Sequence, residues 1–508
     1  MRRPRNVLLI VADQWRGDSL GSLGHPAALT PNLDALAAEG VTFTQHFGQS
    51  APCGPARASL LTGLYVMNHR VVANGVPLDE RHATLAREVK RAGMDPALIG
   101  YTTTTPDPRL VGAQDAAFSE IGDVMHGWRP VAHFDEVQYR NYFAWIAAHG
   151  FTLPSPPDDI WRPAEGPAGP SDAPNRIPAH LSDTAWSADH AIEFLHGTRP
   201  NRPWLLHLGF YRPHPPFAAP APWHEAVPAD RIPRALRRDP ADEGAQHPLM
   251  AHFLATQKRS SYYEGGDGPV TPLSDTEIRQ TRRAYYGLIA EIDHHLGRVF
   301  QALRQSGQWD DTLIVFTSDH GEQLGDHNLL GKLGWFDQSY HLPLIVRDPD
   351  ARPVAGRRVD APTESVDLMP TLLDWLDLPV PRACDGVSLR PWLAGETPHA
   401  WRDAVHFEYD LRGGWPDPGT PPLGLGLDDG ALCVTRTADW KYVHFAGLPP
   451  VLYDRRRDPA EMHNVAGDPA HAPLLAEAAQ RTLSWRLRHA DRTLTHLCAS
   501  PDGLVERR

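Results

Sequence analysis

The stretch Val7-Leu8-Leu9-Ile10-Val11 is a continuous apolar run near the start of the chain. A strand of that composition is buried on both faces, as in a parallel sheet covered by helices. Similar runs occur at residues 97–100, 204–208 and 313–316, and helical patterns lie between them. In one such pattern, residues 276–303, apolar side chains recur every three or four positions. The alternation predicts an α/β fold with a mostly parallel sheet between layers of helices.

The pattern changes near Pro391–Gly395. Beyond it come three short strand-like runs and one helix, at residues 404–408, 432–435, 441–445 and 474–488. Strands followed by a helix are typical of an α+β unit. We therefore predict a catalytic domain over residues 1–395 and a smaller C-terminal domain over residues 396–508, with antiparallel strands and a terminal helix.

Composition limits the partners of the chain. A formal net charge of −13 over 508 residues argues against nucleic acid, because phosphate backbones select basic surfaces. It leaves a small anionic substrate open, since such a ligand depends only on the local field. The 4 cysteines are scattered without a CxxC pair, which fits a reducing compartment better than a disulfide framework. No stretch approaches the roughly 20 apolar residues of a membrane span. We predict a cytoplasmic protein.

Polar residues follow the predicted strands. Asp13 comes after the first, Tyr101 after the second, His214 after the third, and Asp319-His320 after the fourth. Ligands of open α/β sheets bind outside the carboxyl ends of the strands. Each residue alone reads as well as a turn or cap residue. Together, two carboxylates and one imidazole predict a divalent cation such as Mn²⁺ or Ca²⁺, and the histidine favours Mn²⁺.

Residues 50–63, Ser-Ala-Pro-Cys-Gly-Pro-Ala-Arg-Ala-Ser-Leu-Leu-Thr-Gly, predict a helix that Pro55 opens and Gly63 closes. Cys53 then lies at the helix N-terminus, where backbone N–H groups favour developing negative charge. Arg57 lies one turn along and can reach back to the same point. From these residues alone, a nucleophile beside an oxyanion site and an inert buried thiol both remain open.

The run Cys53-Gly54-Pro55-Ala56-Arg57 matches the C-x-P-x-R signature of sulfatases, and the chain resembles the sulfatase family of the alkaline phosphatase superfamily. Further motifs occur in the order of that family, at residues 6–13, 30–37, 317–322, 325–332 and 452–464. The resemblance covers essentially the whole chain. It implies an alkaline-phosphatase-like fold and oxidation of Cys53 to formylglycine by a formylglycine-generating enzyme.

The resemblance also implies the chemistry. One hydroxyl of the hydrated formylglycine attacks phosphorus or sulfur, and the leaving group departs. The second hydroxyl then loses its proton, and the hemiacetal collapses to the aldehyde as its C–O bond to the product breaks and the inorganic or phosphonate product is expelled. Asp13, Asp319 and His320 would bind the metal together with residue 53. Arg57 would hold the nucleophile. Lys332 and His214 would bind the non-bridging oxygens or assist the leaving group.

Two departures from typical sulfatases refine the substrate. Gln14 stands where those enzymes carry a second aspartate, and an amide coordinates only through a neutral oxygen. The run Gly100–Pro108 has hydroxyls in place of a lysine and a histidine. Both features resemble the phosphonate monoester hydrolase and phosphodiesterase subgroup. By that resemblance Gln14 joins the metal ligands, and the substrate contacts are Asn74, Tyr101 and Thr103.

The sequence therefore predicts a formylglycine-dependent hydrolase of phosphonate monoesters and phosphodiesters, with sulfate monoesters as further substrates of the same charge. An arylsulfatase and a non-catalytic binding protein are the alternatives. A serine- or threonine-type phosphatase or phosphomutase is a third, against which the C-x-P-x-R match argues. The subgroup resemblance implies a homo-oligomer, a tetramer or a dimer. Of the remaining histidines, only His327 is of further interest.

Overall fold

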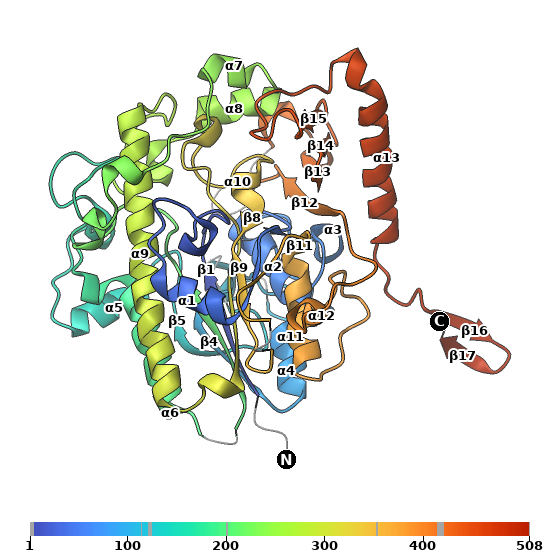
Figure 1. Ribbon diagram of the computed structural model, residues 1–508, viewed down its shortest axis with the longest axis horizontal. Helices are drawn as coiled ribbons and strands as arrows, with labels where there is room; N and C mark the ends of the chain where they lie inside the picture. The colour runs from blue at the N-terminus through green and yellow to red at the C-terminus, as the bar shows by residue number, and fades with distance from the viewer. Residues whose placement is uncertain are drawn as a thin grey trace.

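The central sheet has eight strands in the order β10-β2-β9-β7-β1-β6-β4-β5 (Figure 1). The computed structural model describes residues 5–112, 114–119, 124–199, 202–351, 354–413 and 421–506. The strands of this sheet are β1 (Asn6–Ala12), β2 (Val41–Phe43), β4 (Asp95–Gly100), β5 (Arg129–His133), β6 (Trp204–Phe210), β7 (Thr312–Ser318), β9 (Leu344–Arg347) and β10 (Arg357–Val359).

Pairing in this sheet is mostly parallel, as predicted. β1 pairs in parallel with β6 and β7, whereas β9 runs antiparallel to β7 and β2. The apolar runs at 7–11, 97–100, 204–208 and 313–316 all lie within strands of this sheet. Every residue of β1 is buried, because helices cover both faces of the sheet.

The two faces of β1 belong to different cores. Leu8 and Ile10 pack with α1 (Pro31–Glu39), α6 (Asp183–Gly197) and α9 (Asp275–Gln305). The alternate residues Val7 and Leu9 pack on the opposite face, against three helices: α2 (Cys53–Thr62), α4 (Leu85–Arg91) and α11 (Leu368–Trp375). Side chains of a strand alternate between its faces, so this one run joins both layers.

The C-terminal part contains a four-stranded antiparallel sheet, β12 (Ala404–Asp410), β13 (Ala431–Thr437), β14 (Trp440–Phe445) and β15 (Val451–Asp454). The helix α13 (Ala472–Arg488) packs on β13 and β14. The predicted α+β subdomain is thus confirmed, while its boundary at residue 395 stays a prediction. Beyond α13, the hairpin of β16 (Leu497–Ser500) and β17 (Gly503–Glu506) projects from the body of the molecule (Figure 1).

The remaining elements are short. They comprise a small sheet of β3 (His46–Phe47), β8 (His341–Leu342) and β11 (Thr363–Glu364), and the helices α3 (Val66–His69), α5 (Arg140–Ala148), α7 (Pro240–Gly244), α8 (Pro248–Thr256), α10 (Asp337–Tyr340) and α12 (Arg390–Leu393). Among the described residues, none of the helices combines the length and the apolar character that crossing a membrane requires.

A buried group of charges, which we call the interface cluster, joins the two parts of the chain. Its members are Asp337, Arg436, Lys441, Arg455 and Glu461. The fully buried Nζ of Lys441 lies 2.6 Å from Asp337 Oδ1 and 2.6 Å from Glu461 Oε2. Burial alone would raise the pKa of Asp337, but the charges of Arg436, Lys441 and Arg455 lower it well below its usual value.

Candidate active site

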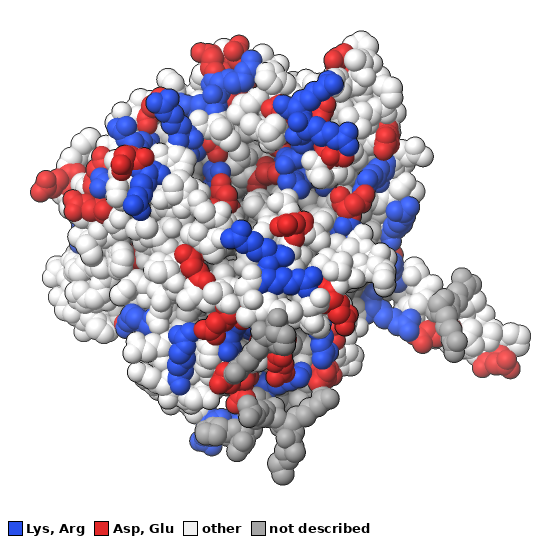
Figure 2. All heavy atoms as spheres, viewed as in Figure 1, with Lys and Arg blue, Asp and Glu red and all other residues white. Residues whose placement is uncertain are grey.

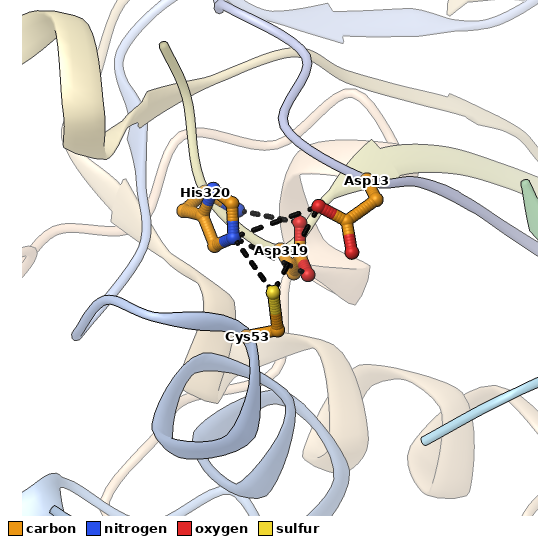
Figure 3. Close-up of side chains that lie close together, drawn as sticks. All are labelled: Asp13, Cys53, Asp319 and His320. Carbon is orange, nitrogen blue, oxygen red and sulfur yellow. Dashed lines mark hydrogen bonds and ion pairs between the residues drawn. The ribbon is translucent and has the colours of Figure 1, made fainter. Parts of the chain in front are cut away.

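The ends of β1 and β7 bring four potential ligands together. Asp13 directly follows β1, Asp319 and His320 directly follow β7, and Cys53 is the first residue of α2. One ligand atom of each lies within 4.8 Å of the others, and all four residues are buried. Their side chains point toward one another (Figure 3). The predicted convergence at the carboxyl edge of the sheet is therefore present.

The helix behind Cys53 begins two residues earlier than predicted. It starts at Cys53 itself, so Pro55 is its third residue. Proline is tolerated there because N–H groups in the first helical turn have no partner inside the helix. The N–H of Gly54 instead donates to Asn74 Oδ1 at 2.8 Å. A Cβ at position 54 would lie 2.9 Å from that oxygen, so the close approach requires glycine.

Three groups surround the sulfur of Cys53. His320 Nε2 lies 3.2 Å from Sγ, Lys332 Nζ donates to it at 3.2 Å, and Asp13 Oδ1 lies 3.9 Å away. Burial raises the pKa of the Cys53 thiol well above its usual value, and the charge of Asp13 adds to the effect. An unmodified Cys53 is consequently a poor source of thiolate.

Arg57 fixes both aspartates. Its Nε donates to Asp319 Oδ2 at 3.0 Å, its Nη2 to Asp13 Oδ2 at 3.1 Å, and its Nη1 to the carbonyl of Tyr101 at 3.0 Å. Each carboxylate therefore directs one oxygen to the guanidinium. Of the other two oxygens, Asp13 Oδ1 faces Cys53, and Asp319 Oδ1 accepts from the backbone N–H groups of Gln14 and His320. Burial alone would raise the pKa of Asp319, but His320 and Arg57 lower it well below its usual value.

The donor set fits a divalent cation. Burial lowers the pKa of His320 to about 4, so the imidazole is neutral near pH 7. Its Nδ1 lies 3.2 Å from the carbonyl of Gly321 and donates to it, which leaves the lone pair of Nε2 directed at Cys53. Two buried carboxylate oxygens and one imidazole nitrogen converge here, and these are the ligand types of Mn²⁺ or Ca²⁺ sites. We call Asp13, Cys53, Arg57, Asp319, His320 and Lys332 the nucleophile cluster.

Gln14 lies between the nucleophile cluster and a buried carboxylate. Its backbone N–H donates to Asp319 Oδ1 at 3.1 Å, and its Oε1 accepts from Lys332 Nζ at 3.0 Å. On the other side its Nε2 donates to Glu322 Oε2. Its φ of 69° is in the left-handed region, a strain that residues at functional sites often carry. Glu322 was part of a sequence motif, but nothing in the sequence indicated this contact.

The predicted substrate contacts differ in their surroundings. The hydroxyl of Tyr101 donates to Asp13 Oδ2 at 2.6 Å, so it supports the ligand group directly. The Oγ1 of Thr103 is buried and its hydroxyl faces the carboxyl of Glu136, and the residue has a φ of 47°. Thr103 thus carries both backbone strain and a buried hydroxyl beside Glu136, whereas Asn74 uses its Oδ1 to hold Gly54.

Sequence reasoning missed one titratable residue of the site, Glu136. It lies after β5, and it interacts electrostatically with Cys53, Arg57 and Lys332. Burial raises its pKa to about 8, although Arg57 and the Thr103 hydroxyl oppose the shift. Its Oε1 is buried without a hydrogen-bond partner among the described residues. The pair Asp135-Glu136 follows a strand end, but β5 is half exposed and lacks the apolar run that would have revealed it.

The two remaining histidines separate. His214 donates from Nδ1 to the carbonyl of Pro215 at 2.8 Å, and burial together with the charge of Lys332 lowers its pKa well below the usual value. It is therefore a neutral neighbour of Lys332. His327 instead stacks on Phe336 with ring centroids 3.7 Å apart, and it has no part in the nucleophile cluster.

Known proteins match the chain over nearly its whole length. Residues 5–378 match the Sulfatase family, and residues 325–488 match the family N-sulphoglucosamine sulphohydrolase, C-terminal. The multifunctional alkaline phosphatase superfamily protein PehA of Trinickia caryophylli is 51% identical over 99% of both chains.

Two solved structures are similar throughout. The phosphonate monoester hydrolase of Agrobacterium radiobacter is 42% identical, with a TM-score of 0.94 over 99% of this chain and 100% of that one. The phosphonate monoester hydrolase SpPMH of Silicibacter pomeroyi is 38% identical, with a TM-score of 0.91 over 99% of each chain. With the sheet edge and ligand group described above, these matches show that the chain is an ester-bond hydrolase of the sulfatase family in the alkaline phosphatase superfamily.

Proposed function

We propose that the chain is a formylglycine-dependent metallohydrolase that cleaves phosphonate monoesters and phosphodiesters and also hydrolyses sulfate monoesters. The observation that carries the proposal is the position of Cys53. Its side chain contacts Asp13 and His320 of the ligand group and also Lys332, the cation placed to meet an anionic substrate. Formylglycine at position 53 would supply a hydroxyl nucleophile in the place that the sulfur now occupies.

The substrate class follows from charge. Near the nucleophile, Gln14 is neutral and Thr103 offers a hydroxyl, so Arg57 and Lys332 are the cations for a bound anion. Such a site suits substrates with one negative charge, which phosphodiesters, phosphonate monoesters and sulfate monoesters share. The names of the two similar solved structures, both phosphonate monoester hydrolases, and of the multifunctional relative support this class.

The residues around Cys53 suit distinct tasks. A divalent cation held by Asp13, Asp319, His320 and residue 53, with Gln14 as a further ligand, would act as a Lewis acid. Lys332 has a pKa well above its usual value, since Cys53 and Asp13 outweigh the effect of its burial. It therefore stays protonated and donates to a non-bridging oxygen. Because the Nδ1 proton of His214 is held by Pro215, its Nε2 carries a lone pair that can accept a hydrogen bond, while the lowered pKa keeps the ring neutral.

Two measurements test the proposal. Mass spectrometry of the peptide around Cys53 should show formylglycine in protein co-expressed with the maturing enzyme. Values of kcat/KM on matched aryl phosphonate, phosphodiester and sulfate substrates should then be highest for the first two. A higher value on the sulfate would make the protein an arylsulfatase. An unmodified thiol without turnover would support a non-catalytic binding protein.

We also propose a homo-oligomer, a tetramer or a dimer, that involves the C-terminal hairpin. Leu487 of α13 is 72% exposed and Leu504 of β17 is 71% exposed. An isolated two-stranded hairpin is marginal in water, so a partner surface would stabilise it. Light scattering of the full chain should give a multimer, and a chain ending at residue 492 should give a smaller species.

Maturation by a formylglycine-generating enzyme and a cytoplasmic location stay predictions. Acidic and basic side chains intermingle over the described residues of one face, without a continuous basic surface there (Figure 2).

A further inference from the structure

Glu322 is a fully buried carboxylate. Among the described residues, it makes no hydrogen bond to any of the four potential metal ligands. Its Oε1 accepts from the backbone N–H of Leu324 at 2.9 Å and of Gly331 at 2.6 Å. Its Oε2 accepts from the side-chain amide of Gln14. Both oxygens thus act as acceptors, which is the role of a carboxylate without a proton.

Gln14 is held from both ends of its side-chain amide. Lys332 can only donate, so the atom of Gln14 that faces it at 3.0 Å has to be the oxygen. Glu322 accepts, so the atom that faces it has to be the nitrogen. The two neighbours therefore fix which way the amide is turned. Lys332 in turn contacts Cys53 Sγ at 3.2 Å, so the chain of contacts runs from Glu322 to the nucleophile.

We propose that Glu322 is a positioning residue that keeps the oxygen of the Gln14 amide directed at the nucleophile cluster. It also places, one hydrogen bond outside the cluster, the negative charge that a carboxylate at position 14 would carry inside it. The site can then hold a divalent cation while the surface next to the substrate stays neutral at Gln14. This inference rests on the proposed function and concerns a residue to which neither the motifs nor the family match gave a role.

The variant E322Q should reverse the Gln14 amide. The N–H groups of Leu324 and Gly331 require an oxygen, so the new side chain has to direct its own oxygen to them. Its NH₂ group then faces the NH₂ group of Gln14, and two donors meet. Rotation of Gln14 relieves the clash but turns its nitrogen toward Lys332 and the metal ligands. Second ligand layers of this kind change metal affinity by about 10–100-fold.

The double variant Q14E/E322Q should restore the contacts with the roles exchanged. The carboxylate at position 14 accepts from Lys332 on one side and from the new amide on the other. The oxygen of that amide still meets Leu324 and Gly331. The double variant loses one carboxylate at position 322 and gains one at position 14, so its net charge equals that of the unchanged protein. Because a carboxylate at position 14 could strengthen Mn²⁺ binding by itself, the single variant Q14E is the reference. A positioning role predicts that Q14E, whose carboxylate would face that of Glu322, gains less over the unchanged protein than Q14E/E322Q gains over E322Q.

The test is the dissociation constant of Mn²⁺, measured by calorimetry on metal-free full-length protein, with folding followed by circular dichroism. E322Q should weaken Mn²⁺ binding about 10–100-fold, and Q14E/E322Q should recover most of the loss. The matched control is E291Q, at a buried carboxyl of α9, and should bind Mn²⁺ as the unchanged protein does.

Unchanged Mn²⁺ binding by E322Q would overturn the inference, as would a loss that the double variant does not recover. If E322Q does not fold, the double variant decides in the same way: folding with Mn²⁺ binding supports the inference, and failure of either contradicts it. A protein that hydrolyses phosphonate esters and binds Mn²⁺ in all variants keeps the proposed function and loses only this inference. A wild-type protein that binds no divalent cation overturns both.

Discussion

The nucleophile cluster and the interface cluster contain similar residue types, but they arrange the charges differently. Around Lys441, one ammonium group lies between the carboxylates of Asp337 and Glu461 and also donates to the carbonyl of Trp335 at 3.1 Å. Opposite charges alternate there, and the protein itself supplies every partner of the lysine. Around Cys53, oxygens of Asp13 and Asp319 meet the lone pair of a neutral imidazole. Acceptors face acceptors, which leaves a place for a cation.

This difference separates a structural ion cluster from a catalytic one. A buried charge is costly unless it is paired, so both clusters have to be compensated. In the interface cluster the compensation is internal, and any loss appears as lost stability. In the nucleophile cluster, Arg57 compensates only one oxygen of each aspartate. Asp319 Oδ1 accepts from the backbone N–H groups of Gln14 and His320, and Asp13 Oδ1 faces Cys53 and the neutral imidazole of His320. A bound divalent cation would offset the charge of these oxygens, so losses there should appear in metal binding and turnover.

The largest expected effect is the loss of activity on replacing Cys53. C53A should lower kcat/KM on an aryl phosphonate by about 10⁴-fold or more, because the nucleophile is gone. Its melting temperature should stay close to that of the unchanged protein. The matched control C433A removes another buried cysteine and should keep full activity. Retained activity in C53A would show that residue 53 is not the nucleophile.

Replacing Lys441 should have the opposite profile. K441M removes one of the two cations that Asp337 and Glu461 share, the other being Arg455. Breaking a buried pair costs up to about 3–5 kcal/mol. Urea unfolding should show the lost free energy, while kcat per folded molecule stays unchanged. K258M, at an exposed lysine, should be neutral in both respects. A K441M variant of normal stability but low kcat would remove the distinction between the clusters.

Added metal should stabilise through the nucleophile cluster alone. At a Mn²⁺ concentration 100 times the dissociation constant, the free energy of unfolding should rise by about 2.7 kcal/mol. Chelation should reverse the gain and abolish turnover. D13N should show little of the gain, because one of the carboxylate ligands is lost. K441M should show all of it, even from its lower starting stability, and an equal rise in D13N would place the cation elsewhere.

The smallest expected effect concerns pH. The pKa of Glu136 is raised to about 8 by burial, so its carboxyl is neutral below that pH and negative above it. A negative carboxylate near the nucleophile repels an anionic ester, and at an effective dielectric constant near 20 this should lower kcat/KM about tenfold. The decline should be half complete near pH 8 and should be absent in E136Q. E291Q is the control, because burial raises the pKa of Glu291 to about 8 as well. A decline that persists in E136Q would exclude Glu136 as its cause.

The central sheet could be predicted because its strands are local signals. Buried parallel strands such as residues 7–11 need an unbroken apolar run, and such a run is a clear signal in the sequence. The short strands β2 and β9 were not predicted, because three or four residues are too few to show a periodic pattern. The hairpin β16–β17 was not predicted either. Its residues are largely exposed, so they show no alternation of apolar and polar side chains.

The candidate site divides in the same way. Asp13, Asp319 and His320 could be predicted because they follow strong strands, and Cys53 because residues 53–57 match the C-x-P-x-R signature of sulfatases. Glu136 follows the weak strand β5, so the same rule could not reach it. The contact of Glu322 with Gln14 joins residues 308 positions apart, and only the fold brings them together.

The burial of Cys53 also has a consequence for timing. The side chain is 3% exposed, and every residue of α2 is buried beneath the sheet edge. A maturing enzyme would need to hold this segment as an extended peptide, which the folded chain no longer offers. Oxidation and folding would therefore compete for each newly made molecule. Molecules that fold first would keep an inert thiol. The specific activity of a preparation should therefore report the fraction of molecules that were oxidised before they folded.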